Sequence, residues 1–248
     1  MRCLSIMMFI SMAFSSWPIL AQDSTRHHSL GVTLGVTSVH NKDEFQSPYT
    51  YKGTNFLLGL SYICTTPRNR HEVVFDLSGG HLQSSVSPVA NSQTGLLTYD
   101  YFFRTKAFAS KLSGALGLGL HAIATRVNYL PDVELPKRYL TAGAFLAADG
   151  RLRYSISRRS ALEFNASVST LGVVYRPDFD IHGKSFTSAA FWGNSLFYTI
   201  TLSYVYQLNP KLDFLVSYRY QNFVCNEPKP IYLSQQGLSI GLRMKGRN

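Results

Sequence analysis

Strict alternation of residue type is the feature that most constrains this chain. In residues 194–221, every even position from Leu196 to Tyr206 is Leu, Ile or Tyr, and most odd positions between them are Ser or Thr. After the short break LNPK, the alternation resumes from Leu212 to Tyr220. Period-two alternation predicts β-strands with two unlike faces. Such strands suit a soluble sandwich, whose apolar face packs in the core, or a membrane barrel, whose apolar face meets lipid.

The lengths of the connections between strands favour the barrel. Short connections alternate with long ones along the whole chain, and an up-and-down membrane barrel has tight turns at one end and long loops at the other. A sandwich has no reason to sort its loops in this way. We therefore predict an all-β fold, a transmembrane antiparallel up-and-down β-barrel of about ten strands. The predicted strands are 29–39, 54–64, 71–82, 94–104, 111–123, 139–156, 160–175, 194–207, 211–222 and 234–245. The short connections are 65–70, 105–110, 157–159 and 208–210, and the long ones are 40–53, 83–93, 124–138, 176–193 and 223–233.

Composition agrees with a surface that faces something other than water. Charged residues make up only 15% of the chain and aromatic residues 13%. The net charge of +10 comes from scattered basic residues rather than from a basic run. Scattered bases argue against nucleic-acid binding and suit contact with anionic lipid head groups.

The N-terminus predicts export. The stretch MRCLSIMMFISMAFSSWPILAQ has a basic start, an apolar run and a break at Trp17-Pro18, with a cleavage position after Ala21. It reads as a secretory signal peptide over residues 1–21, which leaves residues 22–248 as one barrel. Cys64 and Cys225 are the only cysteines left in the exported chain, and the strand order places them at opposite ends, so we expect them to be unpaired.

With these features the chain resembles the small outer-membrane β-barrel proteins of Gram-negative bacteria, particularly those of Bacteroidota. The resemblance covers residues 22–248 as architecture and points to no specific named family. It implies a location in the bacterial outer membrane. It also implies contact with outer-membrane lipid and lipopolysaccharide, and an extracellular protein or glycan partner for the long loops.

The charged residues of the predicted strands all lie on the face opposite the apolar residues. A barrel of ten strands lies near the size at which side chains fill the interior. We expect these acids and bases to pair there as a structural charge network, and a narrow pore for small solutes and a ligand-binding lumen remain the alternatives. The set is Glu72, Asp76, Asp100, Arg104, Asp149, Arg151, Arg153, Glu163, Asp213, Arg219, Arg243 and Lys245.

The sequence offers weak signals for catalysis. Asp178, Asp180 and His182 resemble the rim Asp and His residues of the ten-stranded omptin proteases, and this leaves a barrel-rim hydrolase as a remote alternative. Asp and His are also ordinary residues of a turn-rich segment. His121 reads as a packed lumen residue. We therefore expect a protein that is not an enzyme, with no catalytic residues, no cofactor and no metal ligands.

Overall fold

The computed structural model describes residues 26–44, 49–85, 90–104, 109–129, 139–177, 185–227 and 229–246. The predicted signal peptide lies outside these ranges. The strands are β1 (His27–Asp43), β2 (Thr50–Thr65), β3 (Asn69–Gln83), β4 (Ala90–Arg104), β5 (Leu112–Tyr129), β6 (Tyr139–Ser155), β7 (Ser160–Pro177), β8 (Ser185–Phe191), β9 (Ser195–Asn209), β10 (Leu212–Cys225) and β11 (Ile231–Lys245). Among the described residues there is no helix with the length and apolar character needed to cross a bilayer.

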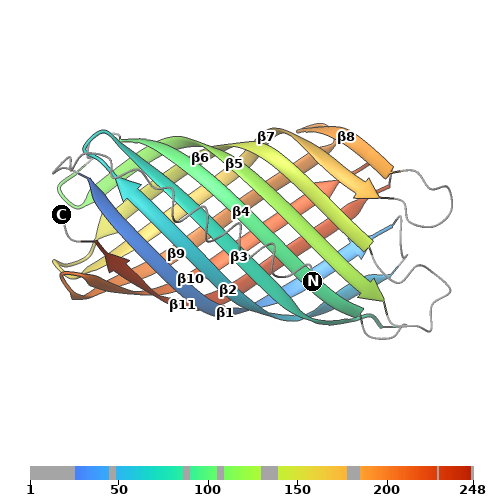
Figure 1. Cartoon of the computed structure of the whole chain (residues 1–248), viewed down its shortest axis with the longest axis horizontal. Coiled ribbons are helices and arrows are strands. Elements are labelled where there is room, and N and C mark those ends of the chain that lie inside the picture. Colours follow the sequence, from blue (N-terminus) through green and yellow to red (C-terminus); the bar gives the residue numbers. More distant parts are fainter. Residues whose placement is uncertain are drawn as a thin grey trace, which may run out of the picture.

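The strands form one closed antiparallel barrel (Figure 1). β1 pairs with both β2 and β11, and the pairing of β6 with β7 completes the ring. β8 and β9 both pair with β7, along successive stretches of it, so the two together make a single crossing. The predicted ten-strand antiparallel barrel is therefore confirmed.

The break between β8 and β9 carries an outward excursion at Trp192. Its indole nitrogen donates a hydrogen bond to the carbonyl oxygen of Ser169. Asn194 fixes the turn, because its side chain accepts from the backbone N–H of Phe191 at 3.0 Å and donates to the carbonyl of Ala189 at 2.9 Å. The interpretation of 176–193 as a long loop was wrong in part, since β8 lies within it.

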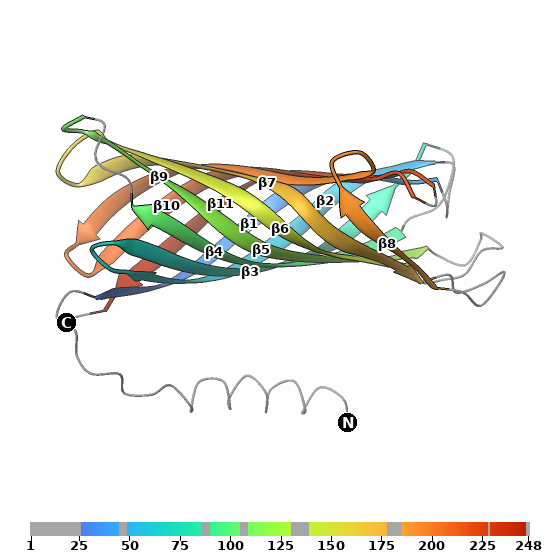
Figure 2. The same ribbon diagram turned by 90° about the horizontal axis from the view of Figure 1, so that it is seen from above.

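The strands are longer than predicted, mainly at the end of the long connections. Apart from β8, they run from 14 to 18 residues, whereas a tilted membrane crossing needs about 9 to 11. The predicted loop 40–53 is an example: β1 continues to Asp43 and β2 begins at Thr50. Backbone pairing, which is indifferent to polarity, extends the ladder through Asn41 and Lys42. We call this the loop end of the barrel, and the opposite end, which carries the short turns, the turn end (Figure 2).

Local side-chain bonds close two of the tight turns. The hydroxyl of Thr66 accepts the backbone N–H of Asn69 at 3.1 Å. The hydroxyl of Ser157 does the same for Ser160, also at 3.1 Å. Such Ser and Thr turns satisfy backbone donors without glycine.

The outer face of the barrel is apolar and exposed. Phe56 is 77% exposed, Leu116 67% and Leu238 60%, and similar side chains project from each of the other crossings. Charged residues in the middle of the strands, such as Asp76, Asp149 and Glu163, are buried inside the barrel instead. Monomeric soluble proteins rarely show contiguous apolar surface on this scale.

The interior has two different halves. The turn-end half holds most of the charged side chains, whereas the loop-end half contains a packed apolar layer that the alternation did not predict. This apolar layer comprises Val39, Tyr51, Leu82, Ala90, Leu96, Ile123, Val127, Phe145, Val174, Ala190, Phe197, Phe223, Cys225, Ile231 and Leu233.

Candidate functional site

The turn-end charge network is the largest polar cluster in the lumen. Five bases surround three acids there, and their side chains come from β3, β6, β7, β10 and β11. Because the cluster draws on strands from both sides of the barrel, it ties opposite walls together. It consists of Arg70, Glu72, Arg151, Arg153, Glu163, Asp213, Arg243 and Lys245.

Glu163 is the centre of this network. It is 3% exposed, and its carboxylate lies 2.5 Å from Nη2 of Arg151 and 2.8 Å from Nη1 of Arg153. Arg243 Nη1 lies 3.8 Å away on a third side. A carboxylate so deeply buried is stable as an anion only because these cations replace its water.

The network extends from Glu163 in both directions. Arg151 also reaches Glu72, with 3.0 Å between Nη1 and Oε2, and Arg70 holds the same Oε2 at 2.8 Å. On the other side, Asp213 binds Arg243 at 3.0 Å and Lys245 at 2.7 Å. The outcome is a continuous chain of alternating charges across the turn end.

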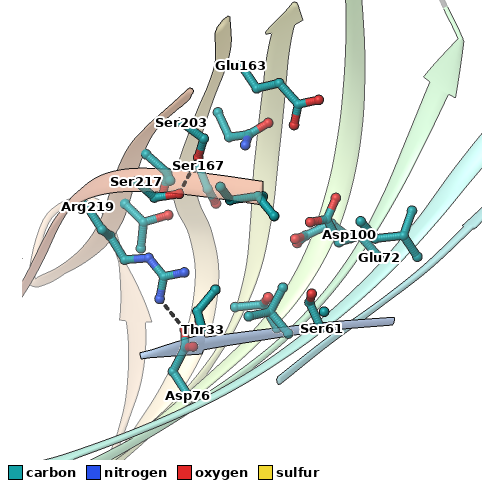
Figure 3. A pocket seen from close by; sticks show the side chains of 18 of the residues that line it. Thr33, Ser61, Glu72, Asp76, Asp100, Glu163, Ser167, Ser203, Ser217 and Arg219 are labelled. Atoms are coloured by element: carbon teal, nitrogen blue, oxygen red, sulfur yellow. Dashed lines mark hydrogen bonds and ion pairs between the residues drawn. The ribbon is translucent and has the colours of Figure 1, made fainter. Parts of the chain in front are cut away.

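A second ion pair lies deeper, where Arg219 of β10 donates to Asp76 of β3 across the lumen (Figure 3). Beside it, the hydroxyls of Ser203 and Ser217 are hydrogen-bonded at 2.8 Å. A cavity of about 150 Å³ separates this pair from Glu163 and is lined by both charged and hydroxyl side chains. That volume is large enough for several water molecules.

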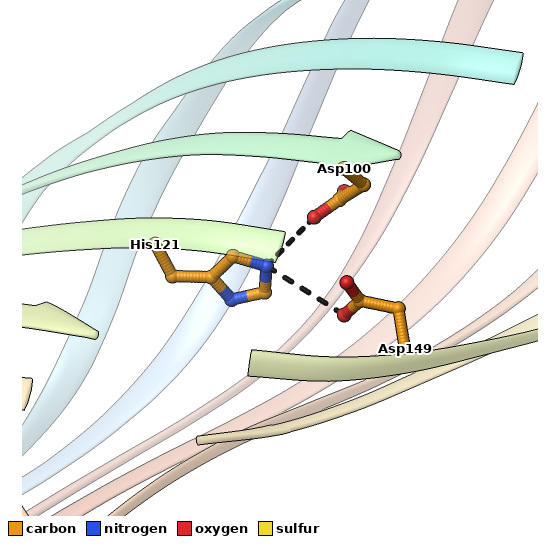
Figure 4. A group of neighbouring side chains, drawn as sticks. All are labelled: Asp100, His121 and Asp149. Atoms are coloured by element: carbon orange, nitrogen blue, oxygen red, sulfur yellow. Dashed lines mark hydrogen bonds and ion pairs between the residues drawn. The ribbon is translucent and has the colours of Figure 1, made fainter. Parts of the chain in front are cut away.

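His121 joins two acids on the wall of the same cavity (Figure 4). Its Nε2 lies 2.8 Å from Oδ1 of Asp100 and 3.7 Å from Oδ1 of Asp149. The hydroxyl of Ser167 lies 3.5 Å from the other ring nitrogen. These residues occupy four different strands, so no short motif in the sequence links them.

Aromatic rings close the lumen on the loop-end side of His121. Phe145 and Phe197 stack with ring centroids 5.5 Å apart, and Phe223 meets Phe145 edge-on at 5.9 Å. Phe197 also presents its edge to His121 at 6.0 Å. The rings therefore form an apolar wall beside the polar cavity.

The loop end has its own buried ion pair. Nη2 of Arg176 on β7 binds Asp43 on β1, and each side chain is 2% exposed. Nη1 of Arg176 donates to the carbonyl oxygens of Glu227 at 3.1 Å and Lys229 at 2.6 Å. One arginine thus fastens the β10–β11 connection to the barrel wall.

The lumen charges expected from the sequence fall into clear groups. The residues that the structure brings into ion pairs with Arg or Lys are Glu72, Asp76, Arg151, Arg153, Glu163, Asp213, Arg219, Arg243 and Lys245, whereas Asp100 and Asp149 contact His121. Arg153 is the most open of the bases, with its side chain 45% exposed. The side chain of Arg104 lies outside the described part of the chain, as do Asp178, Asp180 and His182. Cys64 and Cys225 are both free thiols.

Sequence reasoning missed three lumen charges. Asp43, Arg70 and Arg176 fell in predicted connections because the strands are longer than expected. Asp43 and Arg70 can be found from the sequence by continuing the alternation past the predicted strands 29–39 and 71–82, by two steps and by one step. Arg176 needs more, since the register shifts opposite Leu146 and skips Thr170, and this bulge reverses the inward parity of β7.

Comparison with known proteins shows the fold but does not assign a family. No protein-family model matches the sequence, and no curated protein is detectably similar to it. Among solved structures, the outer membrane protease OmpT from Escherichia coli superposes with a TM-score of 0.58 at 10% identity, over 94% of this chain and 100% of that one. The translocator domain of the autotransporter NalP from Neisseria meningitidis gives 0.51 at 8% identity, over 98% and 96%. The architecture is thus that of bacterial outer-membrane β-barrels.

Proposed function

We propose that this protein is a non-enzymatic outer-membrane barrel with a closed lumen, which acts through its loop end. The observation that carries the proposal is the division of its side chains. Apolar residues such as Phe56 and Leu116 are exposed all round the outside, while acids such as Glu163 and Asp213 are buried within. An exposed apolar outer face together with buried acids inside is favourable only when hydrocarbon surrounds the barrel.

Three successive layers support a closed lumen. The turn-end charge network comes first, the aromatic wall of Phe145, Phe197 and Phe223 follows, and the Arg176–Asp43 pair lies beyond it. An ion that crosses the barrel must displace a salt bridge and then enter an apolar layer. Both steps are costly.

The loop end is proposed to face outside the cell. Outer-membrane barrels have short periplasmic turns and longer extracellular connections, and the turns at 66–68, 156–159 and 210–211 belong to the short set here. The partners proposed are outer-membrane lipid and lipopolysaccharide around the apolar face, and an extracellular protein or glycan at the loop end. Export through a signal peptide over residues 1–21 belongs to the same proposal.

Insertion of a short epitope between Pro177 and Ser185 tests the orientation, because β7 ends at Pro177 and β8 begins at Ser185. Antibody should label the epitope on intact cells. Asn91 is a poor position for such an insertion, since it lies in β4 and pairs with His81. An epitope detected only after the cells are permeabilised would mean that the orientation is reversed.

Planar-bilayer conductance tests the closed lumen. The purified barrel should give no steady current steps in salt, at potentials where an open barrel conducts. Reproducible, ion-selective steps would overturn the closed lumen and establish the narrow pore in its place.

A further inference from the structure

We propose that Asp100, His121 and Asp149 form a binding site for one divalent transition-metal ion, with Zn²⁺ the best-suited ion. This site lies in the lumen, goes beyond the proposed barrel function, and requires no catalysis. It rests on the distances between the ligand atoms, their close approach to Gly119, and the burial of the Asp149 carboxylate.

The ligand atoms already lie at metal-binding separations. One nitrogen of His121 and one carboxylate oxygen from each acid all lie within 4.8 Å of one another. Zn²⁺ binds nitrogen and oxygen ligands tetrahedrally at about 2.0–2.2 Å, which places neighbouring ligands about 3.3–3.6 Å apart. The observed separations from Nε2, 2.8 Å to Asp100 and 3.7 Å to Asp149, bracket that range.

Gly119 lets the three ligand atoms approach one another. A Cβ placed on this residue would lie 2.6 Å from Oδ2 of Asp149, 2.7 Å from Oδ1 of Asp100 and 2.7 Å from Nε2 of His121. All three ligand atoms therefore lie against the backbone at this position. Any residue other than glycine would collide with them.

Asp149 is buried without adequate compensation among the described residues. Its side chain is 3% exposed, and neither carboxylate oxygen makes a hydrogen bond of good geometry, although the hydroxyl of Ser167 lies beside it. The contact with His121 is long, and Asp100 holds the shorter bond to the same nitrogen. A buried carboxylate with so little support is costly unless a cation binds it.

The charge of the cluster suits a divalent ion. Two carboxylates and a neutral imidazole carry two negative charges, and the nearby guanidinium of Arg219 is engaged by Asp76. The competing occupant is a proton, which would make His121 an imidazolium between two acids. Imidazole with carboxylates favours Zn²⁺ over Mg²⁺ or Ca²⁺, which prefer all-oxygen sites. Ser167 near Nδ1 would orient the ring, as outer hydrogen bonds do for metal-binding histidines.

Zn²⁺ titration of the purified full-length protein in detergent, after removal of metal by chelator, tests the site. Isothermal calorimetry should give one ion per chain and raise the unfolding temperature. Co²⁺ in place of Zn²⁺ should give the visible absorption of a low-coordinate site, a signature that a structural histidine cannot produce.

Two variants and one control distinguish Zn²⁺ binding at this site from Zn²⁺ binding at other histidines. Asp149→Asn and Gly119→Ala should each weaken Zn²⁺ binding by about 100-fold or more, the first by removing a ligand and the second by displacing the ligand atoms. Gly59→Ala is the matched control, because its Cβ would meet a lumen carboxylate of Asp76 without touching the cluster. It should bind as the unaltered protein does.

Three results would overturn the site. These are no binding to the unaltered protein, binding that survives Gly119→Ala, and binding that depends instead on the exposed His27 or His28. If a proton occupies the site instead, Asp149→Asn removes one of the two anions beside the imidazolium and should lower stability in the absence of metal. None of these outcomes bears on conductance, so the metal site and the closed lumen can fail separately.

Discussion

Arg176 and Asp43 form a buried ion pair at the loop end although 133 residues separate them in the sequence. They come from β7 and β1, and each side chain is 2% exposed. The guanidinium also holds two carbonyl oxygens of the β10–β11 connection, at Glu227 and Lys229. A single side chain therefore joins three parts of the chain that pass one another only in the closed barrel.

Asp43→Asn should destabilise the barrel strongly. The substitution removes the carboxylate that pairs with the buried Arg176 charge, and removal of one partner of a buried pair costs about 3–5 kcal/mol. Urea unfolding in detergent measures the change. Glu44→Gln is the control, since it breaks the exposed pair with Lys42 and should leave the transition where it is. If both variants unfold at the same urea concentration, the buried pair contributes no more to stability than the exposed pair does.

Glu163→Ala should lower the unfolding temperature and leave conductance unchanged. Arg151, Arg153 and Arg243 would lose their shared anion, at a cost of about 3–5 kcal/mol where water does not reach them. Asp213→Ala should act similarly through Arg243 and Lys245. Thermal unfolding and bilayer current are measured on the same preparation. Intact stability with a shift towards anion selectivity would instead mean a hydrated pore.

Phe223→Ala should open the aromatic wall and also weaken the fold. Phe223 is 1% exposed, and truncation of a buried Phe typically costs about 3–5 kcal/mol. Its loss removes the edge contact with Phe145. Combined with Glu163→Ala, it should produce measurable conductance that neither change produces alone. Phe223→Leu in the same background keeps an apolar side chain in place and should remain closed.

Trp192 should report the surrounding lipid directly. It is 67% exposed on the outside of the barrel, and it is the only tryptophan in residues 22–248. Its indole N–H is hydrogen-bonded to Ser169, so the ring has a polar anchor and an apolar face, as tryptophans near membrane interfaces do. Lipids brominated near the head group should quench its fluorescence more than aqueous iodide does. The opposite order would place Trp192 in water.

The lumen charges show how far alternation alone reaches. Period two fixes the face of a residue on a strand, so it put Glu163 and Arg243 inside without any knowledge of the fold. The same rule failed for Arg176, because the bulge that skips Thr170 reverses parity, and nothing in the local sequence marks that bulge. It also missed Asp43, because backbone pairing carries β1 past the last residue that looks like a strand.

The sequence by itself determined that this chain makes two-faced strands, about how many, and which side chains share a face. These properties are local, since each depends on a residue and its neighbours two positions away. Only the closed barrel decided that Asp100, His121 and Asp149 meet beside Gly119, and that Phe145, Phe197 and Phe223 pack together inside the lumen. Those contacts depend on the register between strands and on which strands lie across the lumen. Both are set by ring closure, which pairs β1 with β11 and β6 with β7.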